Sequence, residues 1–557
     1  MKKSAVLLCG MILLLSNAYA GGILTNTNQS AQFVRMLSRN ASIDLDAVYF
    51  NPAGLAQMKN GFYFGLHNQS ITQNRIIKSE FPLLNRPDNQ NYKEYDGKVS
   101  APAFPSAFAV YKIDKWAFSA GFGPNGGGGS AKYDTGLPSF EKKISALPMS
   151  LVTNLIPTTK YAANIQFEGT SVFWGTQLNG TYSLNENISL SVGVRMLNAV
   201  NTYNGYLKDI KINPNYPAFG ASYNGTNLVS ATQFFTDGKN FLNVLASSST
   251  SSAAALVPAI SGGAGGVLLA NANSIGLTSA QISGIQQLLG AAGMTPTQIG
   301  GATLAVAAGT LTAAAPVFAG KATAMGTNAA ATADINVDTK QTGTGFTPII
   351  GFDIHLDKLN VGVKYEHQTA LKLTNSTVVD GTGLFADKAE SRSDIPGILA
   401  AGADYKLMGN LKISGSYTVF FDKNVAWGPN VYGQNRTIDK NYVELALGVE
   451  YYLTKNFALS AGYLNSNTGV SQAYQSDFSY SNDSYTTGLG LQWNINKKLV
   501  FDAGLMLTTY TNYTKTFDKN GNYNADNAAL INNFGSYKET YGKDTFTFAF
   551  GIGYKIF

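Results

Sequence analysis

Hydrophobic and polar residues alternate along most of this chain, in runs of about ten residues. The segments 359–366, 411–419, 443–450 and 488–495 are clear examples, because almost every second residue in them is apolar. A period of two residues is typical of a β-strand that has one apolar and one polar face. The pattern therefore predicts many strands of this kind.

Short and long connections between these runs follow one another in strict rotation. The short ones are six polar turns at Asp114-Lys115, Asn185-Glu186-Asn187, Asp357-Lys358, Met408-Gly409-Asn410, Thr454-Lys455-Asn456 and Asn496-Lys497. The long ones are polar stretches near 76–102, 125–165, 205–340, 375–392, 425–439, 467–482 and 513–541. Polar residues that tolerate unusual φ favour hairpins, so we expect one end of the sheet to turn tightly and the other to be elaborate.

Six hairpins, a first strand near Gly61 and a last strand ending at Phe557 give about fourteen strands, an even number. We therefore expect an all-β fold, a transmembrane antiparallel β-barrel with apolar residues facing lipid and polar residues facing the lumen. Both termini then lie at the short-turn end, which is periplasmic in bacterial barrels. A soluble β-sandwich also has alternating strands, but these usually have only about 5–6 residues.

The N-terminus and the composition fit export to a bacterial envelope. An apolar stretch at 5–15 and a small-residue cleavage site ending at Ala20 predict a signal peptide over residues 1–20. The only cysteine, Cys9, lies in this stretch, so we expect no disulfide in the mature chain. Charged residues make up 13 % of the chain, against about 25 % in soluble proteins. The formal net charge of +6 is spread along the chain and indicates no nucleic-acid partner.

Residues 21–60 break the alternating pattern. The segment 30–39 has the spacing of a short helix, and an Asn-Pro-Ala-Gly-Leu stretch follows at 51–55. Pro52 lacks a backbone donor and fixes φ, and Gly54 permits unusual φ, so this stretch suits a kinked segment better than a strand. A segment of this kind ahead of the first strand must lie inside or below the barrel. We therefore expect residues 21–60 to form a plug and residues 61–557 to form the barrel.

This Asn-Pro-Ala stretch, soon after a signal peptide and ahead of a barrel of this size, resembles the FadL-type family of outer-membrane transporters for long-chain fatty acids and aromatic hydrocarbons. The resemblance implies that Asn51, Pro52, Ala53, Gly54 and Leu55 belong to an N-terminal hatch that closes a fourteen-stranded barrel. It also implies passive uptake of an apolar ligand, which leaves the lumen sideways into the membrane.

The resemblance further implies an inward kink in the third strand, at the opening through which the ligand leaves. The matching strand starts at Trp116, and Gly121, Phe122, Gly123 and Pro124 near its end are the candidate kink. Gly and Pro interrupt the hydrogen-bond ladder of a sheet, as an opening requires. They are equally common where a strand simply ends, so both interpretations stay open.

A ligand with a carboxylate head needs cations within an otherwise apolar lumen. By alternation, Arg195, Lys364 and Lys412 point inward and are the candidate contacts. The alternative is that these cations pair with lumen carboxylates. Four carboxylates are available for this: Glu366, Glu444, Glu450 and Asp502.

The stretch 205–340 is expected to be a long extracellular insertion. From Asn240 to Gly320 it contains no Asp, Glu, Lys or Arg. Residues 278–289 have an N-cap pair and apolar residues near helical spacing, and 304–318 is Ala-rich. We expect short helices packed as a cap. Their apolar faces either bury each other only or also offer a surface that captures ligand.

The sequence gives little support to an enzyme. His67, His355 and His367 are the only histidines, and they lie on different predicted strands without the spacing of metal ligands. His367 and Thr369 could share a strand face, as in an outer-membrane lipase, but no third group completes a triad. The glycine run 126–129 is not followed by the Lys-Ser/Thr and helix of a phosphate-binding loop. We expect no enzymatic activity, cofactor or metal.

The sequence therefore predicts a passive outer-membrane channel for hydrophobic small molecules such as long-chain fatty acids. The expected partners are this ligand, outer-membrane lipid and lipopolysaccharide, and the barrel-assembly machinery, with the chain as a monomer. The terminal Phe557 resembles the assembly signal, although the outward residues of 546–556 fall out of phase with it. Two other classes stay open: a general diffusion porin, which needs no plug, and a surface adhesin, in which the long loops are the functional part.

Overall fold

The structure of the chain is a computed structural model that describes residues 25–87, 90–425, 436–520 and 525–557. The expected signal peptide and Cys9 lie outside these residues. The described chain divides into two compact units. One contains 25–143, 165–207 and 335–557, and the other contains 144–164 and 208–334.

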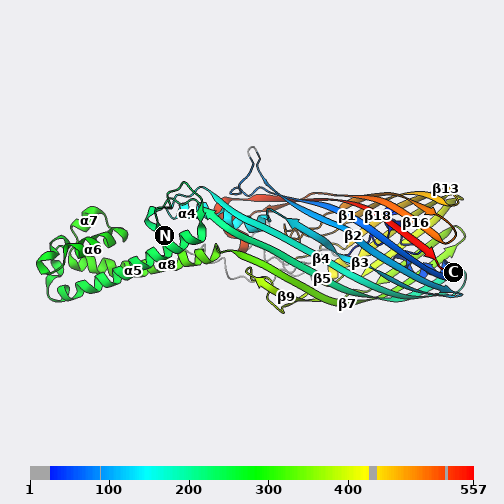
Figure 1. The fold of residues 1–557 in the computed structure, drawn as a ribbon, viewed down its shortest axis with the longest axis horizontal. Helices are drawn as coiled ribbons and strands as arrows, with labels where there is room; N and C mark the ends of the chain where they lie inside the picture. Colours follow the sequence, from blue (N-terminus) through cyan, green and yellow to red (C-terminus); the bar gives the residue numbers. More distant parts are fainter. Residues whose placement is uncertain (1–24, 88–89, 426–435, 521–524) are drawn as a thin grey trace. The chain divides into compact units, whose positions relative to one another are not determined.

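Fourteen long strands form one closed antiparallel barrel in the described chain (Figure 1). They are β1 Gly61–Ser79, β2 Lys93–Ile113, β3 Trp116–Tyr133, β4 Tyr161–Ser183, β5 Ile188–Ile212, β7 Ile335–Leu356, β8 Leu359–Glu366, β11 Ile398–Met408, β12 Leu411–Phe420, β13 Tyr442–Thr454, β14 Phe457–Asn467, β15 Ser484–Asn494, β16 Leu499–Tyr510 and β18 Tyr537–Lys555. Four short strands extend the ladder: β6 Val229–Ser230, β9 Lys372–Asp380, β10 Glu390–Arg392 and β17 Tyr513–Phe517. Neighbours in sequence pair with each other, and β1 pairs with both β2 and β18, which closes the barrel. The predicted all-β barrel is confirmed.

The six predicted hairpins are also confirmed, because each lies between two paired strands. The predicted bounds of several long loops are wrong, because the strands extend into them. Residues 76–79 and 93–102 belong to β1 and β2, and residues 537–541 belong to β18. The strand β1 continues past Thr72 and Asn74, whose outward side chains are polar. The alternation of apolar and polar residues therefore ends before the strand does.

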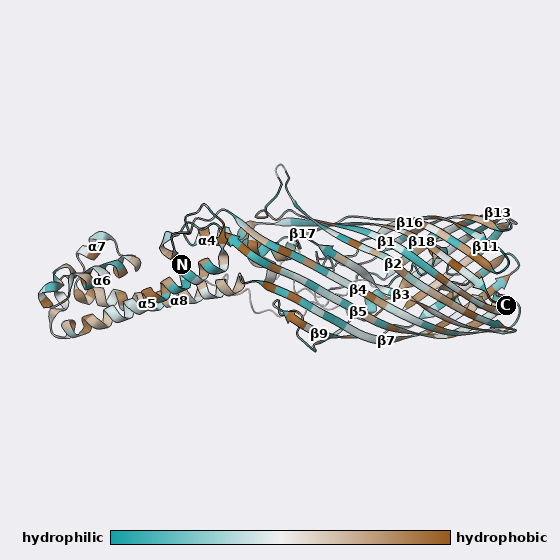
Figure 2. Ribbon diagram, viewed as in Figure 1, coloured by the Kyte–Doolittle hydropathy of each residue, from teal (hydrophilic) through white to brown (hydrophobic). Residues whose placement is uncertain are grey.

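The outer face of the barrel is apolar. Leu445 and Leu447 are 55 % and 61 % exposed, whereas Glu444 and Glu450 on the other face of the same strand are buried. Figure 2 shows hydrophobic and hydrophilic residues alternating along the strands. A closed barrel with an apolar exterior and a polar interior is a membrane-spanning barrel.

The second unit is mainly helical. Its long helices are α5 Ala231–Ser261 and α8 Leu304–Ala331, and α6 Ser279–Ala291 and α7 Pro296–Gly300 lie between them in sequence. Helices α5 and α8 have 31 and 28 residues, so the expectation of short helices is wrong for these two. By length and composition alone, both are long and apolar enough to cross a membrane. The helix predicted at 278–289 is confirmed as α6, which begins at a capping box of Thr278 and Gln281.

These helices share a core of their own, in which Leu256, Leu289, Leu304 and Leu311 are fully buried. The remaining helices of the described chain, in both units, are α1 Ala31–Met36, α2 Ala47–Phe50, α3 Pro138–Ser145, α4 Leu147–Thr153, α9 Ala525–Phe534 and the 3-10 helices η2 Pro52–Gln57, η3 Pro217–Phe219, η4 Ala264–Gly266, η5 Leu269–Ile275 and η6 Asp422–Asn424. The short helix expected within 30–39 is confirmed as α1.

Candidate functional site

The lumen of the barrel contains the N-terminal segment, which we define as residues 25–58. Its helix α1 contacts β13, β14, β15, β16 and β18, while α2 contacts β2 and β3. The 3-10 helix η2 contacts β2, β3, β7 and β8. Because these strands lie around the barrel, the segment reaches across its cross-section.

Capping and a buried carboxylate hold α1 in shape. The Ser30 side chain accepts a hydrogen bond from the Phe33 backbone N–H at 3.0 Å, and Leu37, with φ 65°, ends the helix. Asp46 accepts from Ser30 at 3.0 Å and from Arg39 at 2.6 Å. Burial alone would raise the pKa of Asp46, but the Arg39 charge and these hydrogen bonds hold the pKa below its ordinary value. The segment therefore carries its own charged core.

Arg35 anchors α1 to the barrel. Its guanidinium is fully buried and pairs with Glu450 and with Asp502, the latter at 2.9 Å. The Ser460 hydroxyl accepts a further hydrogen bond at 3.0 Å, and Gln32 donates to Asp502 at 2.8 Å. Removing one partner of such a buried pair leaves an uncompensated charge, so this anchor fixes α1 against β13 and β16.

A row of lumen-facing glycines makes room for α1, and sequence reasoning missed it. A Cβ atom at Gly462 would lie 1.8 Å from the Met36 carbonyl oxygen, so only glycine lets the two backbones approach this closely. The same close approach occurs at Gly448, Gly488, Gly490 and Gly504. Glycines recurring on the polar face of neighbouring strands are the signal that could have found this seat.

The Asn-Pro-Ala-Gly-Leu stretch lies against the opposite wall. Asn51 Nδ2 donates to Asp353 at 2.6 Å and to the Ser42 carbonyl at 3.1 Å. A Cβ atom at Gly54 would lie 2.5 Å from the same Ser42 carbonyl oxygen, which explains the glycine.

The other three residues of the stretch are held through their backbone or by packing. The Pro52 carbonyl accepts from Thr181 at 2.7 Å, and the Ala53 carbonyl accepts from Ser189 at 2.8 Å. Leu55 is fully buried. The stretch is therefore bonded to β4, β5 and β7.

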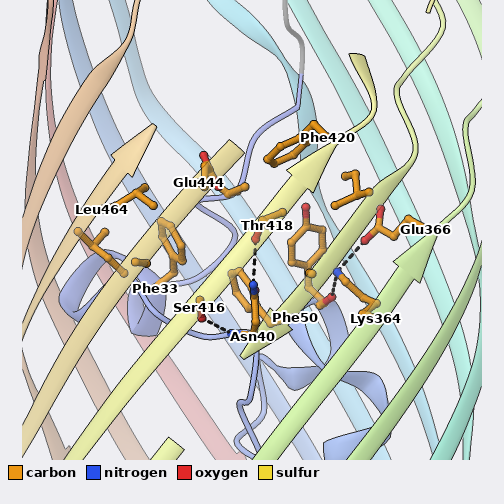
Figure 3. Close-up of a pocket in the computed structure, with 16 residues that line it drawn as sticks. Phe33, Asn40, Phe50, Lys364, Glu366, Ser416, Thr418, Phe420, Glu444 and Leu464 are labelled. Atoms are coloured by element: carbon orange, nitrogen blue, oxygen red, sulfur yellow. Dashed lines mark hydrogen bonds and ion pairs between the residues drawn. The ribbon is translucent and has the colours of Figure 1, made fainter. Parts of the chain in front are cut away.

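All three cations proposed as ligand contacts are paired with carboxylates. Arg195 and Lys364 both contact Glu366, each at 2.6 Å. The Arg195 and Lys364 charges also lie 4.8 Å and 4.4 Å from the centre of the Tyr49 ring. Figure 3 shows Lys364 and Glu366 at one side of a cavity that the N-terminal segment helps to line.

The third cation, Lys412, contacts Glu450 at 3.0 Å and Asp404 at 3.7 Å. Alternation thus located these side chains on the lumen face correctly. The structure contains the alternative arrangement, in which each cation pairs with a lumen carboxylate.

The cavity itself is almost filled. Phe33 and Phe50 from the N-terminal segment and Phe420 and Leu464 from the barrel line it (Figure 3). Asn40 crosses its edge and donates to Thr418 at 2.9 Å. Its free volume is about 30 Å³, room for about two water molecules, whereas sites for small organic ligands have about 300–1,000 Å³. The N-terminal segment thus occupies most of the space in this part of the lumen.

The barrel wall is interrupted between β2 and β3. The two strands pair at Val99 with Ala131 and next at Ala107 with Phe122, with a register shift between these positions. The pairing of β3 with β4 also shifts, at Pro124, Gly126 and Gly129. We call this stretch, residues 100–106 of β2 and 123–130 of β3, the wall break.

Two of the four candidate kink residues lie within the wall break. Gly123 and Pro124 belong to it, whereas Gly121 and Phe122 still pair with β2. Gly127 and Gly129, with φ of 95° and 71°, bend the strand further along.

The start of the N-terminal segment is bonded to the wall break. Thr25 forms an antiparallel bridge with Gly126, and the Asn26 backbone N–H donates to the Asn125 carbonyl at 3.0 Å. Gln29 connects both strands: its side chain donates to the Pro124 carbonyl at 2.9 Å, and its carbonyl accepts from Ser106 at 2.6 Å. Sequence reasoning missed these residues, because a short polar stretch has no pattern that identifies a partner.

His367 and Thr369, the pair that could share a strand face, make separate contacts in the described chain. The Thr369 hydroxyl contacts Thr347, whereas the His367 ring contacts the Tyr365 hydroxyl at 3.2 Å. No group of three or more His, Cys, Asp or Glu suited to a metal ion occurs among the residues that the structure describes.

Comparison with known proteins shows which fold this chain shares. No protein-family model and no curated protein matches the sequence. The crystal structure of a FadL homologue from Pseudomonas aeruginosa is similar with a TM-score of 0.55 and 14 % sequence identity, over 96 % of this chain and 100 % of that chain. The toluene transporter TodX from Pseudomonas putida matches 92 % of this chain and 94 % of its own, with a TM-score of 0.47 and 11 % identity.

The protein is thus a closed β-barrel of the outer-membrane type. Its fold is that of a FadL homologue, which confirms at the level of the fold the resemblance found in the sequence.

Proposed function

We propose that this protein carries hydrophobic small molecules, long-chain fatty acids or related hydrocarbons, across the outer membrane by passive diffusion. In this proposal residues 25–58 act as the plug. The ligand enters from the long-loop end, reaches the apolar lining around Phe33 and Phe50, and leaves sideways through the wall break into the membrane. The FadL-like fold supports the class of ligand, since that family transports such compounds.

The observation that carries the proposal is the contact between the plug and the wall break. At the wall break, Asn26 and Gln29 form hydrogen bonds with Asn125, Pro124 and Ser106. These are backbone or neutral side-chain bonds, each with a net contribution of only about 0.5–1.5 kcal/mol. A few such bonds can open and reform, whereas the Arg35 anchor deeper in the lumen holds the rest of the plug.

A general diffusion porin is the alternative class. A porin has a water-filled lumen, whereas here the N-terminal segment reaches from β13–β16 and β18 to β2, β3, β7 and β8. This packing favours a plugged transporter.

Uptake of radiolabelled oleate and dodecane by cells that produce the protein tests the proposal. We expect uptake of at least one of the two compounds above cells without the protein, and little passage of arabinose. Loss of uptake in an Asn51→Ala, Pro52→Ala variant that still shows heat-modifiable gel mobility would support the role of the plug. Free arabinose passage with no oleate or dodecane uptake would instead identify a porin.

A further inference from the structure

Two cations face each other inside the described part of the barrel, and neither is paired with a carboxylate there. Arg75 of β1 and Lys543 of β18 are directly opposite in the antiparallel ladder. They share the inward phase of their strands with the buried Ile77 and Tyr541. Both side chains are half-buried. Like charges directly opposite destabilise a strand pair, so an uncompensated pair at this position needs an explanation.

The other lumen cations described above each have a carboxylate partner. Arg35 pairs with Glu450, Arg195 and Lys364 pair with Glu366, and Lys412 pairs with Glu450. No ion pair in the described part of the chain includes Arg75 or Lys543. The Arg75 Nε instead donates to the neutral Gln73 at 2.8 Å, and Asp544, next to Lys543, is exposed on the opposite face of the strand.

Aromatic rings surround the two charges. The Tyr480 ring centre lies 5.8 Å from the Arg75 guanidinium and 5.9 Å from Lys543 Nζ. Lys543 Nζ also lies 4.3 Å from the centre of the Tyr510 ring. A hydrogen bond of 2.9 Å from the Tyr480 hydroxyl to the Gly542 carbonyl fixes the first ring. The rings partly stabilise the cations and offer apolar surface beside them.

The pair lies nearer the long-loop end than α1 does. Gly504, against which Arg35 packs, is opposite Ala549, which is six residues along β18 from Lys543. This separation is about 20 Å along the strand. The pair is also beside the wall break, since a Cβ atom at Gly128 would lie 3.5 Å from Arg75 Nη2. A molecule that moves from the long loops towards α1 therefore passes these charges first.

We propose that Arg75 and Lys543, together with Tyr480, bind the anionic head group of an amphiphilic ligand, a fatty-acid carboxylate. The carboxylate would accept charge-assisted hydrogen bonds from both cations and remove their repulsion, while the rings contact the first part of the tail. This inference rests on the proposed function and narrows it, because neutral hydrocarbons gain nothing from the pair. The site is separate from Arg195, Lys364 and Lys412, whose charges are already neutralised by carboxylates.

Binding of radiolabelled dodecanoate to the full chain in non-ionic detergent, measured by equilibrium dialysis, tests the inference. For the Arg75→Gln, Lys543→Gln variant we expect the Kd for dodecanoate to rise about tenfold or more, with 1-dodecanol binding unchanged. The matched control is Lys98→Gln, Lys132→Gln, which removes two exposed cations that also face each other, across β2 and β3. We expect this control to keep the original Kd.

Heat-modifiable gel mobility shows whether each variant assembles. If the double variant does not assemble, the single variant Lys543→Gln, which removes the repulsion, takes its place in the binding measurement. An unchanged dodecanoate Kd, or an equal loss of 1-dodecanol binding, would overturn the inference. So would displacement of dodecanoate by acetate or inorganic phosphate at concentrations near the dodecanoate Kd, because the site would then take small anions in general.

Uptake separates this inference from the proposed function. Dodecane uptake by cells together with an unchanged dodecanoate Kd in the variant would contradict the inference and leave the function standing. Dodecanoate binding that depends on the pair, in a protein that passes neither oleate nor dodecane, would support the site and contradict the transport function.

Discussion

Individual glycines and one carboxylate determine how the N-terminal segment lies in the barrel. Gly462 lets the backbone of β14 approach Met36, and Asp46 holds together the chain around Arg39. Gly462 has no side chain, and the Asp46 carboxylate is buried and already bonded to Arg39 and Ser30. Their contribution is to keep the plug in one closed arrangement.

Gly462→Val should open the lumen. The added Cβ would lie 1.8 Å from the Met36 carbonyl oxygen, and overpacking of this kind typically costs about 1–3 kcal/mol. We expect a barrel that assembles but conducts ions in planar lipid bilayers more than the original protein does. Gly415→Val is the control, because the nearest atom to a Cβ at Gly415 is 4.0 Å away. Equal, low conductance of both variants would show that the glycine seat does not hold the plug.

Conductance should also depend on pH through Asp46. Its pKa is lowered in the folded segment, so its contribution to stability is present above the unfolded-state pKa of about 3.9 and is lost as the pH falls through the folded value. We expect a closed channel between pH 8 and pH 5 and rising conductance only below about pH 4.

Asp46→Asn should raise the conductance already at pH 7, because it leaves the buried Arg39 charge short of a partner, at a cost of about 3–5 kcal/mol. Asp44→Asn is the matched control, since the Asp44 side chain is 44 % exposed and such pairs contribute at most about 1 kcal/mol. A large effect of Asp44→Asn with none of Asp46→Asn would contradict this account.

Sequence alternation identified which residues point inward but not what they contact. Arg195, Lys364 and Lys412 were assigned to the lumen correctly. The Arg195 and Glu366 pair, however, joins residues 171 positions apart, on strands that are not neighbours in the sheet. Such a contact depends on the register of the whole barrel and on the position of Tyr49, a residue of the plug that packs against the Arg195 and Lys364 charges. Local patterns contain neither.

At the scale of elements, the interrupted pairing of β2 and β3 is the feature that separates this barrel from a continuous wall. Gly and Pro in β3 predicted an irregularity near 121–124, but the register shifts continue to Gly129. The extent of the break depends on both neighbouring strands. One strand's sequence therefore indicates where a break starts and not how far it reaches.

Gly127→Ala should reduce uptake by distorting the wall break. Gly127 has φ 95°, and an added Cβ would lie 2.3 Å from the Ser171 carbonyl oxygen. The conformation alone costs a non-glycine residue about 1–3 kcal/mol. We expect dodecane uptake to fall severalfold in a barrel that still assembles. Gly180→Ala on β4 is the control, because a Cβ there meets nothing within 4 Å; unchanged uptake by Gly127→Ala would show that the bend is not needed for transport.

At the scale of the whole molecule, fourteen strands could be counted from the sequence because each tight turn marks a hairpin. The lengths of the strands could not be predicted in this way, because the strands continue past the point where the alternation of hydrophobic residues ends. The lengths of α5 and α8 were missed for a related reason. Ala- and Ser-rich stretches with few charges have weak periodicity, and Pro258 and Pro316 lie inside these helices instead of ending them.

The central claim is that the start of the plug closes an exit in the barrel wall, and a disulfide tests it most directly. Thr25 and Gly126 are bridge partners, and Cα atoms of such partners are about 4.5–5.5 Å apart, within the range of a disulfide. In a Thr25→Cys, Gly126→Cys variant, we expect dodecane uptake to stop on oxidation and to return on reduction. The control is Thr486→Cys, Thr508→Cys, which joins β15 and β16 where they are paired throughout; its uptake should not depend on oxidation. Full uptake by the oxidised Thr25→Cys, Gly126→Cys variant, with the disulfide confirmed by gel mobility, would contradict the claim.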